Sequence, residues 1–234
     1  MARSGLPADR LQVAPASSTV GVDFFGPLKV KHLRKQEKRY GCLFTCLVTR
    51  GVHLEVTHSL STDSFIMSLR RFIARRGKPT VIFSDNGTNF VGANREYGLN
   101  QDKIAGALSK ERIQWVFNSP AAPHMGGVWE RLVRSCKKAL NVVLQNQVLT
   151  DEVLLTAITE VGSLVNSRPL TEVSSDADDL EALAPNHFLI GRATPNLPPG
   201  IFADKEISSQ KRWRQAQVIT THIWKDSCMS IYLV

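Results

Sequence analysis

Short apolar runs follow one another from residue 20 to residue 60, and this succession limits the fold more than any other feature of the chain. The run at 20–28 meets Gly26-Pro27, which predicts a strand that ends in a turn. The stretch 40–60 is rich in Val, Thr, Leu and Phe and predicts two strands with a break near Arg50-Gly51. The basic stretch 29–39 between them is expected to be a hairpin loop.

Helices and strands alternate after this point. Residues 61–77 carry apolar side chains at helical spacing between hydroxyl or Asp caps and a final glycine, which predicts an amphipathic helix. The elements expected next are a short buried strand followed by a turn over 79–87, a polar, partly helical segment at 92–111, a strand at 113–118 and helices at 128–145 and 150–169. Strands first and alternation afterwards predict an α/β domain with a mixed sheet.

Three parts are expected along the chain. Residues 1–18 are rich in Ala, Ser and Pro and predict a linker, 19–170 form the core, and 171–234 form an extension that is irregular before a helix at 206–224. No apolar run approaches the roughly 20 residues that cross a bilayer, so no membrane partner is expected.

Basic residues outnumber acidic ones. The chain has 29 Lys and Arg against 21 Asp and Glu, a net charge of +8, and such a surplus attracts polyanions. Any single basic cluster is more often solvated surface, but several in one domain indicate a nucleic-acid partner. Most of the surplus lies in clusters at 29–39, 70–78, 131–138 and 210–214.

The four cysteines show no metal-binding pattern. They form no C-x-x-C pair, and no pair of histidines has zinc-finger spacing, so no structural zinc is expected. Cys42 and Cys46 lie in an apolar, strand-like run at i and i+4, which predicts that both are buried on one face.

Three carboxylates stand where burial would be unfavourable. Asp23 interrupts an apolar strand, Asp85 ends another, and Glu130 lies in the first turn of the 128–145 helix. A buried carboxylate is disfavoured unless it is paired or bound to a cation. Each one alone could be a hydrogen-bonded structural acid, but the three together suit a site for hard divalent cations such as Mg²⁺.

Polar and basic residues accompany these acids. Asn86 and Asn89 follow Asp85 and can bond nearby backbone or DNA, and the cations at i+4 and i+7 from Glu130 share its helix face. The alternatives are a histidine that stabilises its own loop and a solvated helix surface. The residues expected to contact DNA are Asn86, Asn89, His124, Arg134, Lys137 and Lys138.

Ordered motifs run from about residue 18 to residue 192: VGVDFFGPL, FSDNGTNF, PHMGGVWERLVRSCKKAL, VNSRPLT and APNHFLIGR. Together they resemble the integrase core of BEL/Pao-type retrotransposons. The resemblance implies a ribonuclease H-like fold, with a mixed five-stranded sheet flanked by helices, and a triad of Asp23, Asp85 and Glu130 that binds two Mg²⁺ or Mn²⁺ ions. It also implies DNA 3′-end processing and strand transfer, with element ends and target DNA as partners, a homo-oligomer, and a nuclear location with cytoplasmic transit.

The chain also departs from that family's pattern. Asp85 and Glu130 are 45 positions apart (130 − 85), more than in typical retroviral integrases, so a surface insertion at 92–111 is expected. Neither an N-terminal His/Cys zinc module nor a C-terminal small β-barrel is recognisable, so we expect a fragment, a truncated gene model or a decayed copy. Two other interpretations stay open: a catalytically silent, retroelement-derived nucleic-acid-binding module, and another ribonuclease H-like nuclease or transposase.

Overall fold

An antiparallel meander forms the first part of a central sheet. β1 (Thr19–His32) pairs with β2 (Lys35–Cys46), and β2 pairs with β3 (Val52–Thr57). The computed structural model describes residues 14–104, 113–117, 134, 136, 149–171, 181–194 and 211–231, with the side chains of 97–104 and 223–231 left out. The two strands expected within 40–60, and the break between them, are confirmed.

Two parallel strands complete the sheet. β4 (Val81–Ser84) lies parallel to β1, and β5 (Gln114–Phe117) lies parallel to β4, which gives the order β3-β2-β1-β4-β5. The connections that this requires are α1 (Thr62–Arg76) and α2 (Thr88–Ile104). The predicted α/β class with a mixed five-stranded sheet flanked by helices is confirmed.

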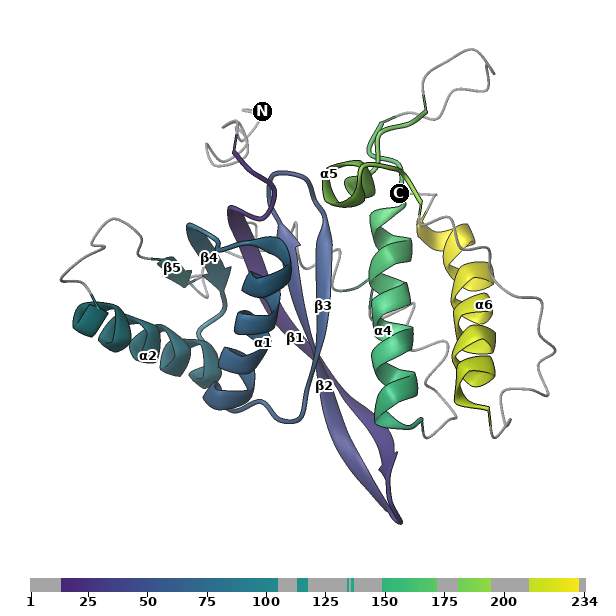
Figure 1. Ribbon diagram of the computed structural model, residues 1–234, viewed down its shortest axis with the longest axis horizontal. Coiled ribbons are helices and arrows are strands. Elements are labelled where there is room, and N and C mark those ends of the chain that lie inside the picture. The colour runs from purple at the N-terminus through teal and green to yellow at the C-terminus, as the bar shows by residue number, and fades with distance from the viewer. Residues whose placement is uncertain are drawn as a thin grey trace, which may run out of the picture.

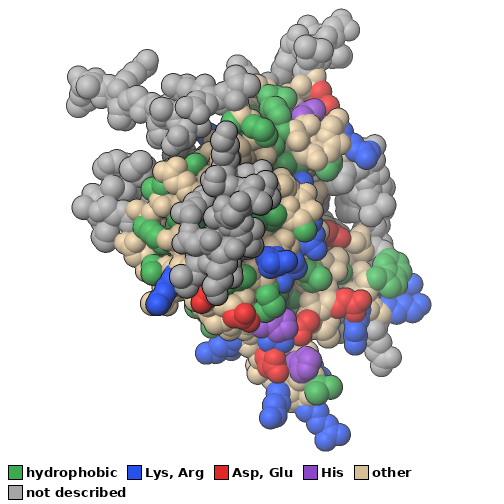
Figure 2. Space-filling model, turned by 60° about the vertical axis from the view of Figure 1, so that its left-hand side comes forward, with side chains coloured by type: hydrophobic (Ala, Val, Ile, Leu, Met, Phe, Trp, Pro, Cys, Tyr) green, Lys and Arg blue, Asp and Glu red, His purple; other side chains and the backbone are tan. Residues whose placement is uncertain are grey.

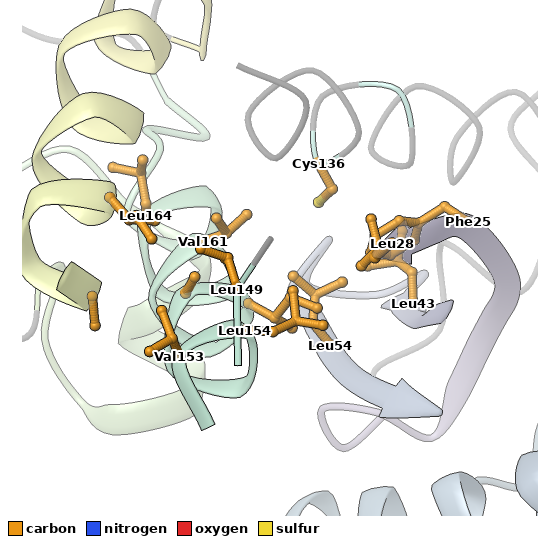
Figure 3. Packing of buried hydrophobic residues seen from close by; sticks show 14 of the residues in the cluster. Phe25, Leu28, Leu43, Leu54, Cys136, Leu149, Val153, Leu154, Val161 and Leu164 are labelled. Carbon is orange, nitrogen blue, oxygen red and sulfur yellow. The ribbon is translucent and has the colours of Figure 1, made fainter. Parts of the chain in front are cut away.

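Helices cover both faces of the sheet (Figure 1). α1 and α2 lie on one side, while α4 (Asp151–Asn166) and then α6 (Arg212–Ile231) lie on the other. Each face therefore buries its own apolar cluster. One contains Val20, Val22, Phe44, Phe65, Leu69, Phe72 and Ile82; the other contains Leu43, Leu54, Leu154, Ile158 and Val161, and Figure 3 shows its sheet and α4 side chains meeting.

The caps of two helices agree with the sequence. Ser61 accepts a hydrogen bond from the Ser64 backbone at the start of α1, and Gly77 ends that helix with a φ of 88°. Thr150 caps α4 in the same way by accepting from the Val153 backbone. The predicted helices at 61–77 and 150–169 are confirmed.

β1 runs farther than its sequence predicted. The β1–β2 pairing is irregular between Phe25 and Leu28 but resumes at Leu28, so the strand continues past Gly26-Pro27. The turn is confined to Leu33-Arg34. Leu28 and Val30 are buried, which stabilises the continued pairing against α4. The expectations of a strand end at Gly26-Pro27 and of a loop over 29–39 were therefore wrong.

Other boundaries also differ from those expected. α2 begins at Thr88, earlier than the polar segment at 92–111, and α6 lies later than the helix expected at 206–224. α5 (Pro185–Ile190) was missed, because so short a helix shows little periodicity. Of the helix predicted at 128–145, the structure describes only two residues, and both are helical. None of the helices within the described ranges is long and apolar enough to cross a membrane.

The VNSRPLT motif fastens α4 to the edge of the sheet. The Asn166 side chain donates to the Val52 carbonyl at 2.8 Å and accepts from the Val52 N–H at 2.7 Å, so it pairs with β3 as another strand would. Arg168 donates to the carbonyls of Val165 and Arg50, and burial lowers the pKa of its guanidinium to about 10. This motif therefore has a structural explanation.

The buried cysteines also have structural roles. Cys42 and Cys46 are buried, as predicted, and Cys136 is buried in the cluster beneath α4. All three are free thiols. Burial raises the pKa of the Cys42 thiol, and it raises that of Cys136 to about 12, so both are uncharged packing groups near neutral pH.

A buried carboxylate joins β3 to α1. Glu55 is 3% exposed, and its oxygens accept from Arg71 Nε at 2.6 Å and from Arg75, while His53 Nε2 lies 2.9 Å away. Burial alone would raise the pKa of Glu55, but the hydrogen bonds from His53 and Arg71 outweigh it and hold the pKa below its ordinary value.

Glu55→Gln is expected to lower the free energy of unfolding by about 1.5–3 kcal/mol at neutral pH, the range for a hydrogen bond to a charged group. Because the folded-state pKa lies below the ordinary value of 4.5, the stabilisation is complete above that value and is lost as the pH falls through the folded pKa. Urea unfolding should therefore show the two proteins converging as the pH falls below about 4.5.

The exposed acid Asp63 provides the matched control. Asp63→Asn should follow the wild-type pH profile. A difference between wild type and Glu55→Gln that stayed constant from neutral to acidic pH would contradict the account of this buried carboxylate.

Candidate metal centre

Asp23 lies in β1, and Asp85 directly follows β4, the parallel strand beside it. The last paired residues of β1 and β4 are Gly21 and Phe83, and each aspartate lies two positions beyond its strand's member of that pair. Adjacent strands are about 4.8 Å apart, and residues two positions on return to the same face. The register therefore brings the two carboxylates to the same level, at the point where β1 and β4 part.

Backbone amides orient both carboxylates. The N–H of Phe24 donates to Asp23 Oδ1 at 2.7 Å, and the N–H of Gly87 donates to Asp85 Oδ1 at 2.9 Å. Asp23 is partly buried and Asp85 is exposed, so the pair lies between the sheet and solvent. Carboxylate oxygens are the donors that hard divalent cations prefer, and this pair of acids fits such an ion.

The residues that follow Asp85 form a tight turn into α2. A Cβ atom at Gly87 would lie 3.0 Å from Asp85 Oδ1 and 2.6 Å from Asn89 Oδ1, so a side chain there would displace the Asn89 amide and crowd the Asp85 carboxylate. Asn89 is 9% exposed, which leaves it less accessible to DNA than the sequence suggested, whereas Asn86 is exposed. The sequence predicted the turn correctly but not that the helix begins within the motif.

An aromatic cluster supports the two aspartate-bearing segments from behind. Phe24, next to Asp23, stacks on Phe90 of α2 with ring centroids 5.4 Å apart. Phe65 of α1 packs edge-on against Phe90 at 4.8 Å. Since Phe24 and Phe90 belong to the segments of the two acids, this contact fixes one carboxylate relative to the other.

Ser84 was not identified from the sequence as a supporting residue. Its hydroxyl accepts from Trp115 Nε1 at 2.9 Å and donates to the Asp85 carbonyl at 2.9 Å. These bonds tie the end of β4 to β5. Residues 84 and 115 are far apart in sequence, so only the fold reveals their contact.

Several predicted site residues lie outside the described ranges. These are Glu130, His124, Lys137 and Lys138. Arg134 is described and is helical and exposed, and its contact with DNA stays a prediction. Within the described part of the chain, no group of three or more His, Cys, Asp or Glu side chains is arranged to hold a metal ion. The described part of the site is therefore the pair of aspartates.

The sheet order and the helices on both of its faces define an α/β fold that a solved structure shares. A chain of the simian T-cell lymphotropic virus intasome, solved in complex with PP2A regulatory subunit B56 gamma, matches with a TM-score of 0.52 and 18% identity. The match covers 81% of this chain but only 59% of that chain. At this identity it bears on the fold alone, and it agrees with the predicted fold class.

Further matches are to the HTLV-2 integrase catalytic core domain in complex with magnesium, in a trimeric and a dimeric form. Each has a TM-score of 0.46 at 18% identity and covers 70% of this chain, with 92% and 94% of the respective matched chains. No protein-family model and no curated protein matches the sequence.

Proposed function

We propose that this chain is the catalytic core of a retroelement integrase, which trims DNA 3′ ends and joins them to target DNA. The single observation that carries the proposal is the shared level of Asp23 and Asp85 on adjacent parallel strands. The ordered sequence motifs support the finer assignment to a BEL/Pao-type retrotransposon. The fold match supports the integrase class.

The residues have separate roles in this proposal. Asp23 and Asp85 hold divalent cations together with Glu130, and the backbone amides of Phe24 and Gly87 keep the two aspartates oriented. Mg²⁺ or Mn²⁺ held there would supply Lewis-acid chemistry for activating the attacking water or 3′-hydroxyl and for stabilising the leaving 3′-oxygen.

DNA is held by polar and basic groups around the carboxylates. Asn86 is exposed beside Asp85, and Arg134 presents a cation to solvent from its helix. Their contacts with phosphate would position the strand without reading its sequence. The same proposal takes element ends and target DNA as partners, a homo-oligomer as the active form and the nucleus as the site of action.

A strand-transfer or disintegration assay with Mg²⁺ or Mn²⁺ tests this function. Wild type should give joined DNA products that disappear with a chelator, and Glu130→Gln should lose them as well. Glu152→Gln, which removes an exposed acid of α4, is the matched control and should keep wild-type activity. Retained duplex binding without any metal-dependent product would overturn the proposal in favour of a catalytically silent DNA-binding module.

A further inference from the structure

The β1–β2 hairpin extends beyond the rest of the sheet as an arm. β2 pairs with β3 only from Tyr40 onward, and β1 pairs with β4 only up to Gly21, so residues 28–39 pair within the hairpin itself. Figure 1 shows the tip of this part projecting at the bottom of the molecule, below the lower end of α4. We name residues 28–39 the basic arm.

One face of the basic arm is anchored to α4. Arg39 is 4% exposed and donates from Nε and Nη2 to the two oxygens of Asp151, at 2.7 and 3.1 Å. Val30 is buried, and the Lys31 N–H donates to the Leu149 carbonyl at 2.7 Å. The arm is therefore held at its base by paired charges, apolar burial and a backbone bond.

The opposite face carries exposed cations. Lys29, Lys31 and Lys38 alternate with the anchored residues, and Lys29 lies directly opposite Lys38 in the register. Like charges facing each other across antiparallel strands are destabilising, so this arrangement is unfavourable unless an anion lies against it.

The tip adds Arg34 and Lys35, and Figure 2 shows Lys and Arg side chains gathered at this end of the molecule. Within the described part of the chain, none of the arm's outward cations forms an ion pair. The arm's acid, Glu37, is paired with Arg39 at 2.8 Å.

We propose that the basic arm binds duplex DNA, with its lysine face against the phosphates and its ribbon in the major groove. That groove is about 12 Å wide and admits a two-stranded β-ribbon. The one large apolar side chain exposed on the arm is Leu33 at the tip, which is too little for the apolar core of a protein interface. An acidic protein is therefore the less suitable partner.

The arm's contact is distinct from the metal centre. Lys29 lies six positions beyond Asp23, which is roughly 20 Å along an extended strand. The arm would therefore hold DNA at a distance from the reacting bond. The choice of DNA as partner rests on the proposed function, but binding by the arm needs no metal and no catalysis.

The triple variant Lys29→Gln/Lys31→Gln/Lys38→Gln of the full chain tests the arm. Fluorescence anisotropy with a labelled DNA duplex in EDTA, from about 50 to 200 mM salt, gives the dependence of log affinity on log salt. The slope should become shallower by about 2 to 3, because each phosphate contact contributes about 0.9, and affinity should fall at least about tenfold. The melting temperature should not fall, because the variant removes a repulsive pair.

The matched control is Arg70→Gln/Arg95→Gln/Arg192→Gln, which removes as many exposed cations from other surfaces. Equal loss of slope in the two triple variants, or an unchanged slope in the arm variant, would overturn the proposal. The proposal would also be overturned if the arm variant lost binding to polyglutamate but retained binding to duplex, since that result indicates an acidic protein partner. If the melting temperature of the triple variant falls, the double variant Lys31→Gln/Lys35→Gln replaces it in the same slope measurement. This double variant does not alter the Lys29–Lys38 pair.

The two proposals fail separately. Asp85→Asn should bind duplex with the wild-type salt slope in EDTA. If the arm variant has a shallower salt slope but wild type gives no metal-dependent products, the integrase activity is overturned and the arm's role stays intact. Metal-dependent products with an arm-independent slope would overturn the arm's role alone.

Discussion

Asp85→Asn should reduce the rate of metal-dependent strand transfer by at least about a thousandfold, which corresponds to about 4 kcal/mol of transition-state stabilisation. The asparagine removes a negative charge and one carboxylate oxygen from the proposed metal ligands. Its amide oxygen can still accept from the Gly87 N–H, so the turn before α2 should keep its conformation. The loss should therefore appear in the rate and not in the melting temperature.

Asp63→Asn is the control for this variant. It removes the same charge from an exposed acid at the start of α1. The control should keep wild-type activity under conditions in which Asp85→Asn gives no product. Activity of Asp85→Asn above about a tenth of wild type would mean that this carboxylate does not hold the reacting metal.

Phe90→Ala should lower the free energy of unfolding by about 3–5 kcal/mol and also impair catalysis. Phe90 is 2% exposed, and it packs against both Phe24 and Phe65. Since Phe24 adjoins Asp23 and Phe90 follows the Asp85 turn, a cavity at this position should loosen one aspartate relative to the other. Misplacement of about 1 Å can reduce a rate about a hundredfold.

Phe72→Ala separates stability from catalysis. Phe72 is 1% exposed and stacks on Phe44 with centroids 4.4 Å apart, so its removal should be comparably destabilising. Urea unfolding would measure both stabilities, and strand transfer would be assayed at a temperature where circular dichroism shows both variants folded. Equal loss of rate in the two variants would contradict a positioning role for the Phe24–Phe90 contact.

The sequence was sufficient to predict that Asp23 and Asp85 end or interrupt short apolar strands. It did not determine that these strands are neighbours, since the β1–β4 pairing joins segments about sixty positions apart. Their common level depends on that register, which local patterns do not specify. The resemblance to integrases implied that the two acids belong to one site, but it gave no strand pairing.

The basic arm was missed for a related reason. Gly26-Pro27 is a strong local turn signal, and a run of lysines and arginines is typical of a loop. β1 continues past this signal because Leu28 and Val30 are buried and because Arg39 bonds to Asp151 at the start of α4, far along the chain. Tertiary contacts therefore outweighed the local turn signal. The Ser84–Trp115 hydrogen bond was not predicted either, because it too depends on tertiary structure.

Locating a bound divalent cation tests directly whether Asp23 and Asp85 form one metal centre. Crystals of the chain soaked in Mn²⁺ would be examined for anomalous scattering, with Asp85→Asn crystals as the comparison. We expect a Mn²⁺ ion within about 2.0–2.2 Å of carboxylate oxygens from both Asp23 and Asp85 in wild type, and its loss in the variant. Manganese bound elsewhere, or bound to Asp23 equally well in both crystals, would contradict the claim that these two aspartates form one metal centre.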